Sequence, residues 1–180
     1  MLFAAIACGV AWAFAAAAQD RPLIHGMVTG VLDGNTLRIQ LVTGPTIVQL
    51  AHIDAPEIRQ PGGREARAAL HEHVIGQEVA LDVLSRDENG WLVAVAWFHD
   101  ENLNGWVVKQ GHAWAYRPDV DDPDYCVWEN GARLLKRGLW GREEWLAPWE
   151  WRQGGKGKAM RYTDYQKATA ASCIAEMKAS

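Results

Sequence analysis

The sequence lacks a surplus of positive charge. Lysine and arginine together number 18, against 22 aspartates and glutamates, so the formal net charge is −4. A chain with this balance repels phosphate backbones as a whole, whereas proteins that bind long nucleic acids through surface charge carry a basic face. A nucleic-acid partner is therefore disfavoured by the net charge and would need a local site.

Cysteine is also scarce, with three residues in 180. Cys8 lies in the uncharged run of residues 1–18, MLFAAIACGVAWAFAAAA, which ends in small residues typical of a secretory cleavage site. No Lys or Arg precedes the run, and the run is nearly long enough to span a membrane, so an uncleaved anchor is the alternative. We expect an exported protein, periplasmic or secreted, with membrane attachment only if this segment is retained.

Cleavage of that segment would leave two cysteines, Cys126 and Cys173. In an oxidising compartment this pair favours a single disulfide. In a reducing compartment, two buried thiols are the better interpretation.

Zinc-ligand spacing and nucleophile motifs are absent from the sequence. His71 and His73 are two residues apart on an expected helix, so they point in different directions and cannot easily bind one ion together. His52, His99 and His112 show no ligand spacing, and no serine or cysteine stands in a recognisable nucleophile motif. Structural zinc domains and triad hydrolases are thus disfavoured.

Alternating apolar and polar residues dominate the first half of the chain, as in Thr36-Leu37-Arg38-Ile39. Turn signals separate the expected strands, which cover residues 22–32, 36–42, 45–53, 78–85 and 91–98. Helical spacing predicts a helix within 62–76, inserted between the third and fourth strands, and further helices at 103–110 and 123–137. The pattern predicts an α+β fold: a five-stranded OB-type β-barrel with an inserted helix and C-terminal helices.

The composition changes along the chain. We expect a signal peptide or anchor at 1–18, the barrel domain at 22–142, a tryptophan-rich tail at 143–152, and a linker with a C-terminal helix at 153–180. Ten tryptophans are present, and most should lie in the core or clamp the tail onto the barrel.

Acidic and amide side chains flank two turns of the predicted barrel. Asp33 and Asn35 follow the first strand, and Asp54 and Glu57 follow the third. Neighbouring strands would bring these segments to one rim, where their oxygens suit a hard cation such as calcium. The alternative is an ordinary turn and an ordinary strand exit with no ligand.

Several motifs in series resemble the staphylococcal nuclease (thermonuclease-like) family. They are VTGVLDGNTLRIQ, VQLAHIDAPE, GREARAAL, RDENGWLVAVAWF, LNGWVVKQGHAWAY and KRGLW, which together cover about residues 24–141. The later PWEWR, residues 148–152, is similar to the tails of exported bacterial members.

This resemblance implies a calcium-dependent phosphodiesterase of DNA and RNA on an OB barrel. Asn35 and Asp54 match direct calcium ligands, Ala55 matches the position that offers a backbone carbonyl, and Asp33 is a nearby acid of the same turn. Glu57 matches the carboxylate that activates the attacking water.

The sequence departs from the family at both phosphate-binding arginines, where Gln49 and Trp91 stand instead. Neither side chain can imitate the planar, two-pronged cation that stabilises charge on phosphorus. Asn35 in place of an aspartate should weaken calcium binding further. A substitute arginine would have to come from Arg38, Arg59, Arg64 or Arg86, and otherwise we expect no positive side chain at the rim.

The leading hypothesis is an exported nuclease-like domain whose phosphodiesterase site is degraded and which serves binding or assembly. In that reading Trp91 either fills the former cleft or offers a stacking surface to a ligand or protein partner. The alternatives are an active calcium-dependent nuclease with altered arginines, and a membrane-tethered subunit of a larger complex.

Overall fold

A computed structural model describes residues 22–154, 160–161 and 170–179. The strands are β1 (Ile24–Val31), β2 (Thr36–Leu41), β3 (Gly44–Leu50), β4 (Ile53–Asp54), β5 (Glu78–Arg86), β6 (Leu92–Phe98), β7 (Glu101–Asn102), β8 (Trp114–Ala115), β9 (Glu144–Trp145) and β10 (Met160–Arg161). The helices are α1 (Gly63–Val74), α2 (Leu103–Lys109), α3 (Asp124–Leu134), the 3₁₀ helix η1 (Gly138–Gly141), α4 (Pro148–Arg152) and α6 (Ala170–Met177). The predicted leader lies outside the described residues.

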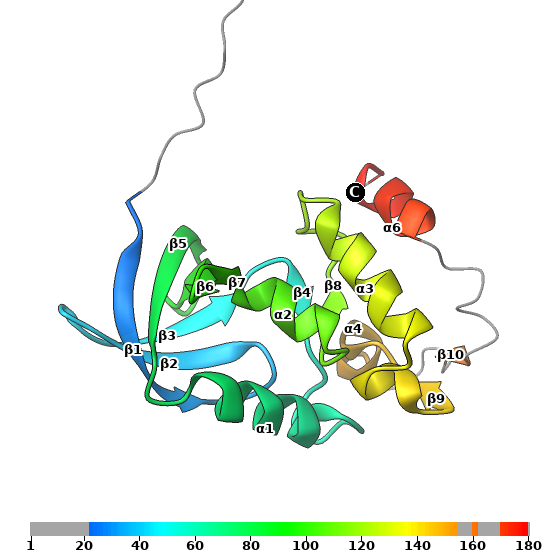
Figure 1. Cartoon of the computed structure of the whole chain (residues 1–180), viewed down its shortest axis with the longest axis horizontal. Helices are drawn as coiled ribbons and strands as arrows, with labels where there is room; N and C mark the ends of the chain where they lie inside the picture. Colours follow the sequence, from blue (N-terminus) through cyan, green and yellow to red (C-terminus); the bar gives the residue numbers. More distant parts are fainter. Residues whose placement is uncertain (1–21, 155–159, 162–169, 180) are drawn as a thin grey trace, which may run out of the picture.

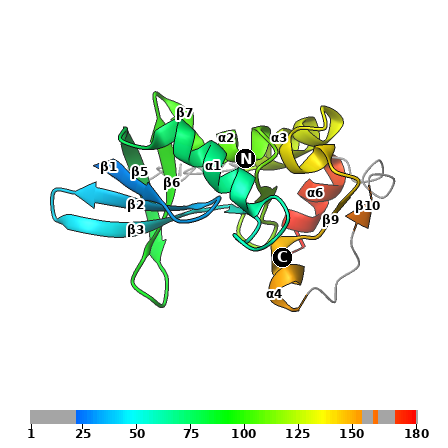
Figure 2. The same ribbon diagram turned by 90° about the horizontal axis from the view of Figure 1, so that it is seen from below.

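Five strands close into a barrel. The strand order is β3-β2-β1-β5-β6, and a parallel pairing of β3 with β6 closes the ring, while β7 extends β6. In Figures 1 and 2 the barrel occupies one side of the molecule, and α3, α4 and α6 occupy the other. The predicted α+β fold with a five-stranded barrel and an inserted helix is confirmed.

The barrel interior is filled by alternate strand residues, because side chains on a strand point to opposite faces. Val28, Leu37, Ile39, Val48 and Leu81 are completely buried there. Helix α1 adds Ala66, Leu70 and Val74, which share one helical face.

The predicted third strand, 45–53, is wrong at its end. β3 stops at Leu50. His52 has a left-handed backbone conformation, with a φ of 66°, which is incompatible with an extended strand. Asp119 stabilises this turn, because its Oδ2 accepts the His52 backbone N–H at 2.9 Å and its carbonyl oxygen lies 2.8 Å from His52 Nδ1. Asp54 therefore lies on the separate strand β4, which pairs with β8.

The predicted helix at 123–137 is also too long, since α3 ends at Leu134 and Lys136 has a φ of 52°. A disulfide joins Cys126 on α3 to Cys173 on α6, with the two Cα atoms 5.6 Å apart. The structure thus contains the cysteine pair that the sequence predicted.

A second core cluster lies beside the barrel and consists of Trp114, Ala132, Leu139, Trp140, Trp145 and Ala147, with Trp149 packed against it. Its indole rings meet edge to face: Trp114 and Trp140 at 5.1 Å between centroids, and Trp140 and Trp145 at 5.4 Å. Such contacts stabilise beyond the area that they bury. The cluster fixes the tail that leads into α4, as the sequence predicted.

A buried carboxylate connects the barrel to this second cluster. Glu129 on α3 is 1% exposed and pairs with Arg117 and Arg133, and the Arg133 guanidinium lies over the Trp140 ring. The Ala115 backbone N–H of β8 also donates to Glu129, at 2.8 Å. Because β8 pairs with β4, this network helps to fix the strand that carries Asp54.

Among the residues that the structure describes, none belongs to a helix with the length and apolar character needed to cross a membrane.

Candidate functional site

The turn after β1 and the segment after β3 meet at one end of the barrel, as predicted. Asn35 donates its backbone N–H to Asp33 Oδ1 at 2.9 Å and its side-chain Nδ2 to the carbonyl oxygen of Ile53 at 3.3 Å. Asn35 and Asp54 are both 8% exposed. The carboxylates of Asp33 and Glu57 both act electrostatically on Asp54.

Close packing holds the two segments together. A Cβ atom on Gly34 would lie 2.6 Å from the Cβ of Ala55 and 2.9 Å from that of Ala66, so only glycine lets the turn lie flat against this surface. Ala55 itself is buried at 3% exposure. The position expected to offer a carbonyl thus lies at the rim.

A cation that the sequence did not predict occupies the rim. The guanidinium of Arg152, the last residue of α4, donates from Nη2 to Asp54 Oδ2 at 2.7 Å and from Nη1 to Asp54 Oδ1 at 3.1 Å. Nη1 also donates to Glu57 Oε1 at 3.0 Å. The expectation that no positive side chain lies at the rim was therefore wrong.

The tail reaches the rim through a defined set of contacts. Pro148 begins α4 at a position where its missing N–H leaves no hydrogen bond unmade. Gln60, 4% exposed, donates to the carbonyl oxygen of Leu146 and accepts the backbone N–H of Glu57. One side chain thus holds the tail and the acidic loop together, directly beside the contact of Arg152 with Glu57.

The electrostatics of the pair follow from burial. Burial raises the pKa of Asp54 above its ordinary value of 3.8, and the hydrogen bonds and charge of Arg152 act in the opposite direction. The hydrogen bonds that Arg152 donates to Asp54 raise the pKa of Arg152, which is charged at every physiological pH. The ion pair therefore compensates part of the cost of burying the Asp54 carboxylate.

Calcium does not fit the rim while Arg152 lies there. Calcium takes about six to eight oxygen ligands, but both Asp54 oxygens and Glu57 Oε1 accept hydrogen bonds from the guanidinium. In the described parts of the chain, no group of three or more His, Cys, Asp or Glu side chains could hold a metal ion.

Gln49 and Trp91 lie on adjoining parts of the barrel wall. Gln49 of β3 is opposite Val93 of β6, and Trp91 immediately precedes β6. Trp91 is 38% exposed, and Asp87 Oδ1 accepts its backbone N–H at 2.8 Å, so a turn presents the indole to solvent. This exposure leaves the indole accessible to a ligand.

The four arginines considered as substitutes are all exposed. Arg86 donates to the carbonyl oxygen of Gly90 at 3.0 Å, Arg38 lies on β2, and Arg64 lies in α1. Arg59 lines an open pocket together with Glu57 and Arg152. Of these four, Arg59 is the one shown to share a pocket with Glu57.

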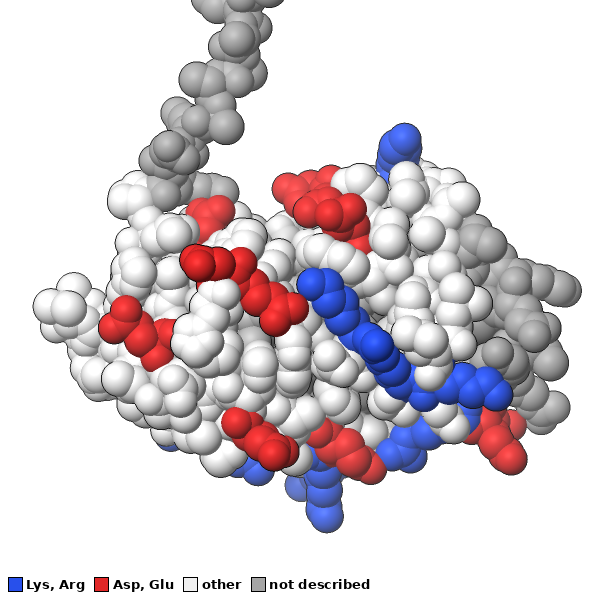
Figure 3. All heavy atoms as spheres, in the orientation of Figure 1, with Lys and Arg blue, Asp and Glu red and all other residues white. Residues whose placement is uncertain are grey.

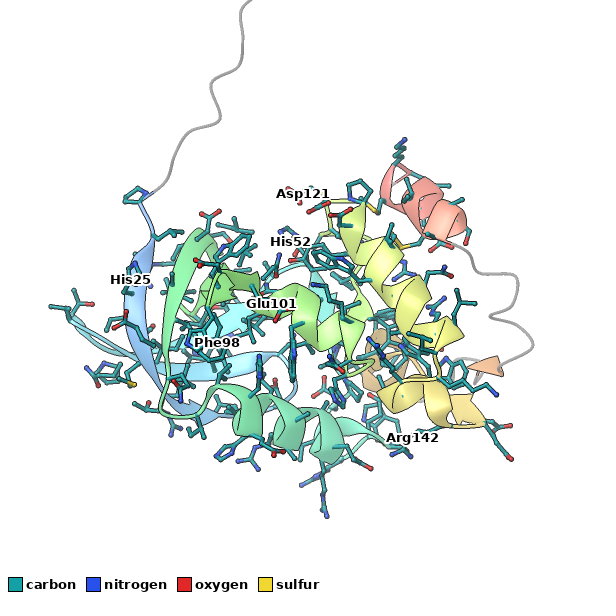
Figure 4. All side chains as sticks on the ribbon, viewed as in Figure 1. His25, His52, Phe98, Glu101, Asp121 and Arg142 are labelled. Atoms are coloured by element: carbon teal, nitrogen blue, oxygen red, sulfur yellow. A yellow bond between two sulfur atoms is a disulfide. The ribbon has the colours of Figure 1, made fainter. Side chains whose placement is uncertain are left out.

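The histidines lie apart from this site. His73 stacks on Trp106 with 3.9 Å between ring centroids, and burial lowers its pKa. His52 Nε2 lies 3.7 Å from Asp121 Oδ1 near the start of α3, as Figure 4 shows. His73 thus contributes to packing, and His52 contacts the acidic segment before α3.

Comparison with known proteins adds to this geometry. Residues 47–142 match the family model described as "Staphylococcal nuclease homologue". An "Uncharacterized endonuclease" of Escherichia coli is 36% identical over 130 residues, which cover 72% of this chain and 85% of that protein.

Two further relatives have similar coverage. "Protein ParB" of Escherichia coli is 35% identical over 141 residues, covering 72% of this chain and 80% of that protein. "Micrococcal nuclease" of Shigella flexneri is 35% identical over 144 residues, covering 73% and 82%. With the barrel and the rim motifs in place, these matches show that the chain belongs to the staphylococcal nuclease homologue family.

Proposed function

We propose that this chain is an exported member of the nuclease family that no longer hydrolyses phosphodiester bonds and serves as a binding or assembly domain. The observation that carries the proposal is the contact of Arg152 with both Asp54 and Glu57. A guanidinium there takes the position that the family resemblance gives to a metal ion. Unlike a metal ion, it offers no open coordination position to a water molecule or a phosphate oxygen.

Glu57 is also poorly placed to act as a general base. A base must accept the proton of an attacking water through a free oxygen lone pair. Its Oε1 already accepts from Arg152 at 3.0 Å, and the side chain is partly exposed. Arg152 donates to one oxygen of the carboxylate only, so proton transfer from water to Glu57 would have to go through Oε2, beside the guanidinium.

The replaced arginines support the same proposal. Loss of one arginine that stabilises a phosphoryl transition state lowers the rate by on the order of 10³ to 10⁵. Two such losses need not multiply, because groups that act together are not additive. Without a substitute arginine, Gln49 and Trp91 therefore place the expected rate far below that of a complete site.

One observation favours a second candidate function, an active nuclease with a relocated arginine. Arg152 is a strong phosphate-binding group within reach of the predicted base, and its side chain is 47% exposed. If a cation displaced it from Asp54, the guanidinium could turn toward a substrate phosphate.

A cleavage assay separates the two candidates. We expect the purified wild type to degrade single-stranded DNA and RNA in millimolar calcium no faster than Glu57→Gln, because neither the base nor the phosphate site is complete. Cleavage by the wild type that is lost in Glu57→Gln would contradict the first candidate function. Loss of that cleavage in Arg152→Met as well would establish the second.

Export is part of the proposal, supported by the small-residue site after residues 1–18 and by the Cys126–Cys173 disulfide. A protein partner outside the cytoplasm fits these features. The intact mass of the protein from a periplasmic fraction should correspond to a chain that begins after Ala18, and a full-length mass would support an anchored subunit instead.

A further inference from the structure

An open pocket of 480 Å³ lies beside the rim, outside the barrel. Its lining consists of Glu57, Ile58, Arg59, Trp151 and Arg152, from the loop after β4 and the end of α4. Pockets for small ligands have volumes of about 300 to 1,000 Å³. The size therefore suits a small molecule.

Arg152 presents an unused edge to its surroundings. Asp54 accepts from both Nη atoms, and Glu57 takes a second hydrogen of Nη1. The N–H of Nε and the second N–H of Nη2 lie side by side on the remaining edge, and within the described part of the chain they meet no acceptor. Two parallel donors on a planar group match two oxygens of a phosphate or carboxylate.

The ion pair with Asp54 makes this edge a better binding group. A free arginine side chain loses rotamer entropy when it binds a ligand. Asp54 and Glu57 already hold the guanidinium in one orientation, so less of that entropy remains to be lost.

Arg59 supplies a second donor group to the same pocket. The side chain is exposed, and in the described residues it makes no hydrogen bond or ion pair. Asp54 and Glu57 offset the charges of Arg59 and Arg152, so recognition of an anion here depends on directed hydrogen bonds more than on net attraction.

Trp151 adds an aromatic surface. Its side chain is partly exposed, and no other ring in the described residues stacks on it. It borders the 480 Å³ pocket and a second pocket of 170 Å³ next to Gln60 and Trp145. An exposed indole offers a flat aromatic face on which a nucleic-acid base can stack.

We propose that this pocket binds a mononucleotide, with the phosphate held by Arg59 and the Nε–Nη2 edge of Arg152 and the base stacked on Trp151. The inference rests on the proposed function, in which Arg152 stays bound to Asp54. A single nucleotide also fits the charge distribution better than a long strand does. On the face in Figure 3, basic side chains form a diagonal strip over the helical side, and acidic side chains lie over both the barrel and the helical side.

Isothermal titration calorimetry with adenosine monophosphate tests the site. We expect binding by the wild type, at least tenfold weaker binding of adenosine and of inorganic phosphate, and on the order of tenfold loss in both Arg59→Gln and Trp151→Leu. Trp151→Phe keeps an aromatic face and should retain binding within about threefold. Arg38→Gln removes an exposed arginine from β2 and should leave affinity unchanged.

Arg59→Gln decides the outcome, because within the described residues its exposed side chain makes no hydrogen bond or ion pair whose loss could unfold the protein. Absence of binding at millimolar nucleotide, or equal affinity of wild type and Arg59→Gln, overturns the proposal. If Arg59→Gln weakened the binding of phosphate and of the nucleotide equally, and Trp151→Leu changed neither, the pocket would be a site for small anions alone. That result would also overturn the proposal. The nucleotide contains no phosphodiester bond, so this result and the cleavage assay fail independently.

Discussion

Replacing Glu129 with glutamine should lower the free energy of unfolding by about 3–5 kcal/mol. The carboxylate is 1% exposed and pairs with two arginines whose side chains are 15% and 10% exposed. Removal of its charge takes away the buried anion that the two guanidinium groups share in a largely desolvated site. Urea denaturation at pH 7 with linear extrapolation measures the change.

Glu176→Gln is the matched control, because Glu176 pairs with the same Arg117 at 3.4 Å but is 64% exposed. We expect this change to cost less than about 1 kcal/mol. A loss below 1 kcal/mol in Glu129→Gln would contradict the assigned role of the buried network. Since Glu129 also accepts the N–H of Ala115, the variant should loosen the β4–β8 pairing that carries Asp54.

Replacing Arg152 with methionine should destabilise the protein by about 2–3 kcal/mol at pH 7. A fully buried pair broken at one partner costs about 3–5 kcal/mol, and the half-exposed guanidinium lowers this figure. The loss should shrink as the pH falls. Burial already raises the pKa of Asp54 in the wild type, and without Arg152 nothing opposes that effect.

The direction of this pH dependence follows from the linkage between proton binding and folding. A raised pKa in the folded state contributes stability below the unfolded value of 3.8, and this contribution is lost as the pH rises through the folded pKa. Asp54 in Arg152→Met therefore destabilises the fold most at neutral pH. Melting temperatures between pH 3.5 and 7 should converge at the acid end for the two proteins. Arg142→Met removes the exposed pair with Glu65 and should change stability by less than about 1 kcal/mol.

The barrel could be predicted because its signals are local. Leu37 and Ile39 alternate with exposed residues along β2, and the turns carry glycine, asparagine and aspartate. The meeting of Asp33 and Asn35 with Asp54 follows from strand adjacency, once the barrel is assumed.

The occupant of the rim could not be predicted in the same way. Arg152 is 98 residues from Asp54, and no periodicity indicates where a short tail packs. Its position depends on the edge-to-face contacts among Trp114, Trp140 and Trp145. The number of tryptophans in the sequence suggests a cluster of this kind, but it does not show where the rings lie in space. The only sequence signal was the PWEWR segment itself, which ends in the arginine concerned.

The end of β3 was mispredicted for a similar reason. Residues 50–53, Leu-Ala-His-Ile, are apolar except for the histidine, and this pattern predicts that the strand continues through them. The left-handed backbone of His52 is stabilised by Asp119, which is 67 residues away, and only the folded chain brings the two together. Tertiary contacts thus decided the two features on which the site depends, the separate strand β4 and the docked tail.

The position of Arg152 also bears on the role of the paired carboxylates, Asp54 and Glu57. Asp54 and Glu57 need not be idle remnants of a metal site, because together they orient a guanidinium toward the pocket of Arg59 and Trp151. The same acids that would serve hydrolysis in a metal-binding relative could serve ligand recognition here.

The central claim is that Arg152 takes the place of a metal ion, and calcium-dependent thermal stabilisation tests it most directly. A ligand that binds only the folded state raises the melting temperature. With ionic strength held constant, we expect no shift for the wild type in about 5–10 mM calcium, which is roughly five- to tenfold above the dissociation constant of about 1 mM of the weakest physiological sites. We expect an upward shift for Arg152→Met that disappears in the double variant with Asp54→Asn. A calcium shift of the wild type as large as that of Arg152→Met would contradict the claim.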